Sequence, residues 1–262
     1  MLDVKVSPYR IYIGERFSVS FQRTRRLVPA EGKQSFRPPS SLGALPIHAV
    51  PDYPEGVPQE WQEERAVFFP ISPGEAFWLG LSGVNWKPTA VKVRLGGIDA
   101  VTGARPEGAL HDAPQNYVVC PPQLALDGIY RGGGFVSQFA ITHRDSDSPG
   151  TFSADGEVAM EIVVIEPKPG RFPEQAPRRS RDAVVAHSPR NSDSGDFVQI
   201  VAGATIAQAI FADPYGIGTW DQSNYGFVSV YAVSAERYRQ ITGLELPPPV
   251  DETHAYKKYR LP

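Results

Sequence analysis

The chain of 262 residues contains a single cysteine, Cys120. One thiol cannot form an intrachain disulfide, so a disulfide-stapled secreted scaffold is excluded. No run of about 18 apolar residues occurs, so no membrane-spanning helix is predicted. The N-terminal sequence MLDVKVSPYR has no basic segment followed by an apolar one, so no secretory signal peptide is expected. These absences predict a cytoplasmic location, although export without a leader would leave the same picture.

An excess of basic charge is also missing. Lysine and arginine number 26 against 29 aspartate and glutamate residues, which gives a net charge of −3 and a pI near 6.0. Dedicated nucleic-acid-binding domains usually carry a clear basic excess. We therefore expect no nucleic-acid partner.

Motifs that carry known chemistry are absent as well. The chain has no Gly-x-Ser-x-Gly elbow, and no two of its histidines share a metal-like short spacing with cysteine or acid ligands, which predicts no zinc site and no cofactor. The one thiol precedes Pro121-Pro122 in an apolar run and is interpreted as a buried side chain. The sequence leaves enzymatic activity uncertain and favours a non-enzyme. The five histidines are His48, His111, His143, His187 and His254.

Proline and glycine, by contrast, are frequent, with 26 and 24 residues. They punctuate the ends of short apolar segments instead of forming one tract, a pattern typical of all-β proteins. Strand alternation is clearest at Val91–Leu95, where three apolar residues alternate with Lys92 and Arg94. This period of two predicts one buried and one solvated face. Further strands are expected at 4–6, 10–13, 17–21, 67–70, 76–81, 117–120, 135–141, 158–165, 197–200, 206–211 and 226–233.

Two glycine-containing stretches predict turns. Asp127-Gly128 lies between apolar residues and predicts a hairpin turn. The Gly132–Gly134 run precedes a strand, whereas phosphate-binding loops precede a helix, so a hairpin turn is favoured there too.

These patterns together predict an all-β, mainly antiparallel fold. We expect a β-sandwich or jelly-roll-like body over residues 1–165, a linker or arm rich in proline and charge over 166–196, and a small β-plus-helix part over 197–262 that packs on the body. The helix is expected at 235–242, with Ser234 as its N-cap and Gly243 beyond its end.

The sequence PQNYVVCPPQLALDGI, followed by GGGFVSQFAI, resembles a signature of an uncharacterised family of bacterial and fungal proteins, some of them fused to a ubiquitin-like segment. The family pattern runs PQ-[DN]-Y-x-V-x-P-x-Q-P-W-L-D-G-I and then R-Q-F-x-A. The chain departs from it at Leu124-Ala125, where the family has Pro-Trp, and at Ser137, where it has Arg. The resemblance implies a shared architecture and no known activity. The matching residues are Pro114, Gln115, Asn116, Tyr117, Val119, Pro121, Gln123, Leu126, Asp127, Gly128, Ile129, Gln138, Phe139 and Ala140.

Candidate ligand-binding residues lie in and near this signature. His111 and Asp112 are neighbours in an expected loop, where function often resides. Asp127 is an acid–base candidate, although a turn-forming role is simpler, and Gln123 belongs to the signature. Asp145 and Asp147 have calcium-like spacing, but the glycine and closing glutamate of an EF-hand loop are missing.

A cluster of three arginines follows the strand expected at 17–21, and two interpretations of its role are open. Arg23, Arg25 and Arg26 are expected at a solvated strand end, with an anion or polymer contact as the alternative.

Two functions remain open. A non-enzymatic binding or assembly protein, a structural protein that pairs with a protein partner or with itself as a homo-oligomer, is suggested by the long proline-rich segments 29–64 and 166–196, which could wrap a neighbour. The alternative is a carbohydrate-binding or carbohydrate-active β-sandwich, suggested by the β architecture and by the tryptophans, which would have to be exposed on one face to stack on a sugar. The four tryptophans are Trp61, Trp78, Trp86 and Trp220; burial of these side chains in a core is the competing interpretation.

Overall fold

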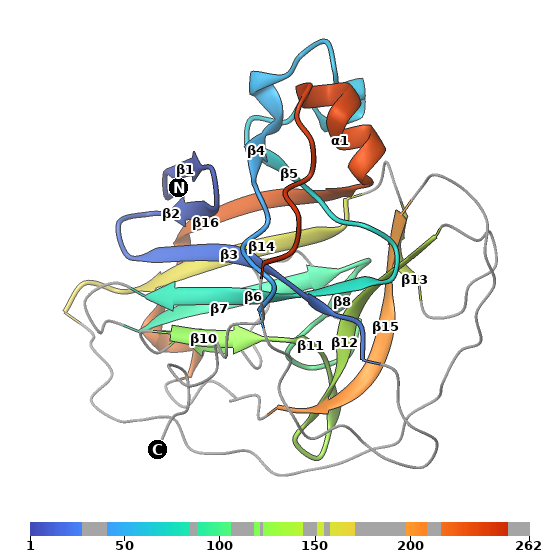
Figure 1. Ribbon diagram of the computed structural model, residues 1–262. Coiled ribbons are helices and arrows are strands. Elements are labelled where there is room, and N and C mark those ends of the chain that lie inside the picture. Colours follow the sequence, from blue (N-terminus) through green and yellow to red (C-terminus); the bar gives the residue numbers. More distant parts are fainter. Residues whose placement is uncertain are drawn as a thin grey trace.

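A computed structural model describes residues 1–27, 41–83, 88–105, 118–120, 123–143, 151–154, 158–170, 198–208 and 216–250. These residues form two facing sheets (Figure 1), and almost every strand pairing is antiparallel. The exception among the described pairings is β5 with β16, which run parallel. The expected all-β, mainly antiparallel fold is confirmed.

The first sheet contains β1 (Val4–Ser7), β2 (Arg10–Ile13), β3 (Phe17–Arg25), β6 (Glu75–Gly83), β12 (Phe135–His143), β15 (Val198–Ala207) and β13 (Thr151–Ala154) in that spatial order, with β10 (Gln123–Leu126) beside β6 and β11 (Gly128–Gly132) beside β12. The second contains β4 (His48–Ala49), β5 (Ala66–Pro70), β16 (Trp220–Val233), β14 (Met160–Pro167), β7 (Thr89–Leu95) and β8 (Ile98–Asp99), with β9 (Val118–Cys120) also beside β7.

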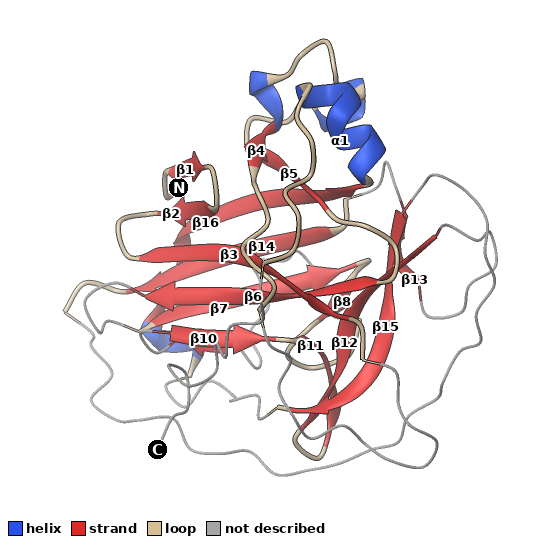
Figure 2. Cartoon of the chain, in the orientation of Figure 1, coloured by secondary structure: helices blue, strands red, loops and turns tan. Residues whose placement is uncertain are grey.

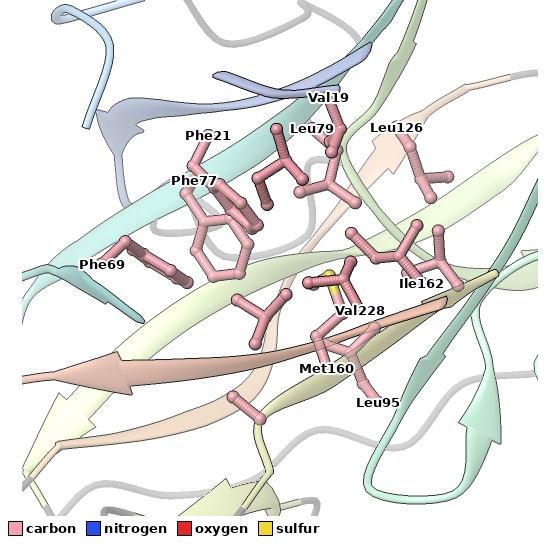
Figure 3. Close-up of a cluster of buried hydrophobic side chains, with 14 of the residues drawn as sticks. Val19, Phe21, Phe69, Phe77, Leu79, Leu95, Leu126, Met160, Ile162 and Val228 are labelled. Carbon is pink, nitrogen blue, oxygen red and sulfur yellow. The ribbon is translucent and has the colours of Figure 1, made fainter. Parts of the chain in front are cut away.

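The main core fills the space between the two sheets (Figure 3). Aromatic rings form its centre: Phe21 stacks on Phe69 with ring centroids 4.4 Å apart, and Phe77 stacks on Phe139 at 5.2 Å. Aliphatic side chains such as Ile162 surround them, fully buried. Burying each such side chain contributes about 1.5–3 kcal/mol, so this layer is the main source of stability.

A second apolar cluster lies at one end of the sandwich, where the helical segments gather (Figure 2). The 3₁₀ helices η1 (Val50–Asp52) and η2 (Gln59–Trp61) and the helix α1 (Ala235–Thr242) pack there. Another short 3₁₀ helix, η3 (Ile217–Thr219), precedes β16. No helix in the described ranges is long and apolar enough to cross a membrane.

The caps of α1 are those expected from its sequence. The N–H of Arg237 donates to Ser234 Oγ at 3.1 Å, which satisfies one of the first-turn donors. Gly243 ends the helix with φ of 72°, a left-handed conformation that glycine adopts without strain. The predicted helix is therefore confirmed, with the same bounds.

Strands from the last third of the chain complete both sheets. β15 pairs with β12 along nearly its whole length, and β16 lies between β14 and β5. Their inward side chains, among them Ile200 and Val228, belong to the main core. We expected the body to end at residue 165, but both sheets continue beyond it. Within the described part of 197–262, β15 belongs to the first sheet and β16 to the second.

The outer face of β7 is packed instead of solvated, contrary to the alternation pattern. Lys92 is 1% exposed, and Arg94 is half-buried. Ala90 on the same face joins Val163 and Trp220 in a third apolar cluster. The expectation of a solvated face was wrong, because Lys92 and the apolar side chains around it on this face are buried.

Asp127-Gly128 does not form the expected hairpin turn. β10 pairs with β6, whereas β11 pairs with β12, so Asp127 lies where the chain passes from one strand to another. The turn lies instead at the end of β11, where Gly132, Gly133 and Gly134 all have positive φ. Gly128 is needed because a Cβ there would collide with the backbone carbonyl of Ser137.

Two glutamine side chains complete backbone hydrogen bonding where strands end, one at this transition and one at the end of β3. Gln208 accepts from the N–H of Asp127 at 2.9 Å and donates to the carbonyl of Ala125. Gln138 accepts from the N–H of Leu27 and donates to the carbonyl of Arg25, both at 3.0 Å. A glutamine amide has an acceptor carbonyl and a donor NH2 group. It can therefore take the place of the backbone C=O and N–H that a neighbouring strand would supply.

We predict that Gly128→Ala lowers the free energy of unfolding by about 2–3 kcal/mol, because the strands β11 and β12 must move apart to admit the methyl group. Chemical denaturation measures the change. The matched control is Gly218→Ala, where an added Cβ meets nothing within 4 Å; it should change stability by less than about 0.5 kcal/mol. Equal stability of the two variants would contradict the close approach.

Candidate functional site

The structure describes the side chain of only one of the four predicted ligand-binding residues. His111 and Asp112 lie outside the described residues, as do Asp145 and Asp147. Gln123 is the first residue of β10, opposite Ser82, and its side chain is outside the description. Asp127 is 1% exposed, and its backbone N–H and carbonyl bind Gln208 and Phe139.

The signature region does not lie at a solvent-facing cleft within the described residues. Leu124 packs against the main core, and Ala125 is buried opposite Gly80. These are two of the three positions at which the chain departs from the family pattern, and both serve strand packing here.

A groove of about 270 Å³ at one end of the sandwich is the candidate site. Three segments that are distant in the sequence build it: the turn between β1 and β2, the segment 42–46, and the chain that follows α1. We call residues 244–250 the C-terminal strap; it runs from α1 past β4 toward β3 (Figure 1). The lining residues are Tyr9, Arg23, Leu42, Gly43, Ala44, Leu45, Pro46, Leu246, Pro247, Pro248 and Val250.

The first wall of the groove is the segment 42–46, which extends the sheet beyond β2. The N–H of Leu45 donates to Phe21 at 2.8 Å, and Arg23 exchanges backbone hydrogen bonds with Leu42 and Gly43 at 2.8 and 2.9 Å. β2 pairs with β3 only as far as Val19. The segment thus covers the part of the β3 edge that would otherwise expose unpaired backbone groups.

The C-terminal strap forms the opposite wall. The N–H of Val250 donates to the carbonyl of Leu42 at 2.9 Å. Gly43 permits this approach, because its φ is 112° and a Cβ there would lie 3.3 Å from a methyl group of Val250. Leu246 packs against both the main core and the cluster around α1. The strap is therefore anchored at both ends and not draped loosely over the surface.

Arg23 lies at the base of the groove and joins its parts. Its Nη1 donates to the carbonyl of Pro247 at 2.8 Å, and its Nε lies 3.2 Å from Glu75 Oε1. The side chain of Arg23 is 4% exposed. Burial lowers the pKa of Arg23, while the carboxylate of Glu75 acts in the opposite direction. The expectation of a solvated strand end was wrong for Arg23, because the strap covers it.

The rim of the groove carries large exposed side chains. Tyr9 is 48% exposed and Val250 is 54% exposed. The prolines at positions 46, 247 and 248 also line the groove. Proline cannot donate a backbone hydrogen bond, so these walls offer carbonyl acceptors and apolar surface. Such a surface suits an extended peptide more than a highly polar small molecule.

A histidine network lies next to the groove. His48 Nδ1 is 2.8 Å from the hydroxyl of Tyr53, and Nε2 is 3.0 Å from the hydroxyl of Tyr238, while the ring stacks on Phe68. A neutral imidazole has one donor and one acceptor nitrogen, so one tyrosine donates and the other accepts. Tyr238 belongs to α1, so His48 fastens the helix from which the C-terminal strap begins.

Burial sets the protonation of this network. It lowers the pKa of His48 below its ordinary 6.5, and the carboxylate of Asp52 offsets only part of that effect. Burial also raises the pKa of Tyr53 and of Tyr238. All three groups are therefore favoured in their neutral forms. Within the described residues no three histidine, cysteine or acidic side chains gather as a metal site would require.

The tryptophans that suggested sugar binding do not provide a stacking surface. Trp61 is 1% exposed, Trp78 is 2% exposed and Trp220 is 1% exposed. Trp61 stacks on Tyr231 with centroids 4.4 Å apart, inside the cluster at the helical end. Burial in the core is confirmed for these three, and Trp86 lies outside the described residues.

Comparison of the chain with protein-family models, with curated proteins and with solved structures gives no match.

Sequence reasoning did not identify the groove. Its residues are common apolar types and one arginine, spread over four segments without a shared motif. The available signals were the proline run at 247–249 and the arginine among apolar residues in β3, and neither specifies a contact between them.

We predict that the free energy of unfolding decreases as the pH falls below about 6.5, because the folded state lowers the pKa of His48. In that range the unfolded chain binds more protons than the folded chain, so stability rises with pH and reaches its full value above the unfolded pKa. Denaturation of the wild type and of His48→Gln at a series of pH values measures this effect. The difference between the two curves should depend on pH in this window; a constant difference would contradict the prediction.

Proposed function

We propose that this is a non-enzymatic binding and assembly protein that docks an extended protein segment in the groove. The observation that carries the proposal is the exposed apolar rim, Tyr9 and Val250, above a base that is fixed by buried Arg23. The first partner that we infer is a second copy of the chain, which would make the protein a homo-oligomer.

The construction of the groove supports an extended occupant. Both of its walls are extended chain held by backbone hydrogen bonds, so an additional extended segment can continue the same pattern. The rigid base matters because a preformed site avoids part of the ordering cost of binding. Tyrosine is also among the residues that contribute most to protein interfaces. The cytoplasmic location expected from the sequence stays part of this proposal.

Carbohydrate binding is less well supported than it was on the sequence alone. It rested on exposed tryptophans, and three of the four are buried. Carbohydrate binding stays a prediction, and no exposed tryptophan among the described residues supports it.

We predict that the wild type self-associates in a concentration-dependent manner, measured by size-exclusion chromatography with light scattering. Tyr9→Asp should weaken the association at least tenfold, or about 1.4 kcal/mol, because it places a charge on the apolar rim. Tyr12→Asp is the matched control: Tyr12 is 40% exposed, like Tyr9, but lies on β2 and does not line the groove.

A wild type that is monomeric at all concentrations would contradict self-association. The docking of another protein is then tested with a photo-crosslinking amino acid at position 9 or at position 12 in a cell extract. Defined adducts from position 9 alone would support docking in the groove. Equal adducts from both positions, or none from either, would contradict it.

A further inference from the structure

A lysine and an aspartate meet in the buried outer layer of the second sheet, away from the groove. Lys92 Nζ lies 4.0 Å from Asp99 Oδ2, and the two side chains are 1% and 2% exposed. Lys92 is on β7 and Asp99 ends β8, the next strand, beyond the turn at Gly96-Gly97. Asp99 pairs directly with Arg94, which places Lys92 diagonally opposite on the same face.

The surroundings of this pair disfavour charge. Lys92 lies opposite Val163 of β14 and beside Ala90, both members of the third apolar cluster. Burial lowers the pKa of Lys92 and raises that of Asp99. Arg94 lowers both pKa values, and the mutual attraction of the pair opposes the effect of burial. In a medium of low polarity, transfer of one proton within the pair gives an amine and a carboxylic acid.

The carboxyl group of Asp99 is held in a fixed orientation. Its Oδ1 accepts from the N–H of Val101 at 2.8 Å and from the N–H of Thr102 at 3.1 Å. Oδ2 is therefore the oxygen nearest Lys92. Two N–H donors on one oxygen resemble an oxyanion hole, which polarises a carbonyl and stabilises the negative charge that develops when a nucleophile adds.

We propose that Lys92 and Asp99 form an intramolecular amide bond, an isopeptide crosslink between β7 and β8. The ammonium proton of Lys92 passes to Oδ2, and the freed Nζ lone pair adds to Cγ while the C=O electron pair moves onto Oδ1. Nζ then loses a second proton to the departing hydroxyl, the Cγ–Oδ2 bond breaks, and one water leaves. No oxidant or other reactant is needed, and the side-chain charges of the pair disappear.

The crosslink is independent of the proposed function. It would join the turn at Asp99–Thr102 covalently to the middle of β7, which pairs with β14 in the second sheet. It would also remove an ion pair from an apolar layer, where separated charges are costly.

Mass spectrometry of the full-length protein tests the proposal. The wild type should be one water lighter than its sequence, whereas Lys92→Arg and Asp99→Ala should each have their full sequence mass. Asp99→Asn can form the same amide by losing ammonia, so it should be one ammonia lighter than its sequence. This variant keeps the side-chain shape and tests the chemistry even if the alanine variant folds poorly.

Tryptic mapping locates the bond. Cleavage after Lys92 should be blocked, and the peptide that ends at Arg94 should stay attached to the peptide that begins at Leu95. Lys5 and Asp3 form the internal control, because their charged atoms are closer, at 3.4 Å, but the side chains are 78% and 71% exposed; these should not be joined. Full sequence mass with cleavage after Lys92 would overturn the proposal, as would a water loss mapped to a succinimide at Asp127-Gly128.

Discussion

The pairing of backbone groups along β3 and β6 is the constraint on which most of the remaining structure depends. On one side β6 pairs with β3 from Glu75 to Gly83. On its other side it has two successive partners, β10 and then β12. A sheet that divides in this way leaves backbone groups unpaired at the fork, and a buried unpaired group costs about 1–3 kcal/mol. The amide of Gln208 bonds the backbone of Ala125 and Asp127 at this fork, and the buried amide of Gln138 bonds the backbone of Arg25 and Leu27 at the end of β3.

The same constraint on the outer edge of β3 produces the groove. Because β2 covers only the first part of β3, the segment 42–46 must cover the rest. The C-terminal strap then adds to this segment, and Arg23 binds its carbonyl across the gap. The groove is thus the space left where β2, the segment 42–46 and the C-terminal strap each cover part of the backbone of β3 or of its neighbour. A site of this kind depends on the whole fold, so it leaves no compact motif in the sequence.

Most strands and the α-helix in the described part of the chain follow from local rules. Alternating apolar residues identify β3 and β7, an apolar run identifies β12, and the cap residues fix both ends of α1. The errors at Arg23, Lys92 and Asp127 have different causes. The charge run at Arg23 and the alternation at Lys92 favoured solvated faces, but neither pattern reports what the rest of the chain packs against those faces. Likewise, an Asp-Gly pair signals a change of chain direction, and the sequence alone does not distinguish a hairpin turn from a passage between two strands.

Arg23 and Lys92 are the buried cations among the described residues, and each meets its burial in a way that matches its chemistry. Arg23 stays protonated in proteins, and its planar group reaches a carbonyl and a carboxylate at once, so it holds the base of the groove by directed contacts. Lys92 has a point charge, is buried, and lies 4.0 Å from the carboxylate of Asp99. Lysine can lose its proton when buried, and the neutral amine is a nucleophile. An arginine at position 92 could only remain an ion-pair partner, so the choice of lysine there permits a covalent solution that the groove arginine does not.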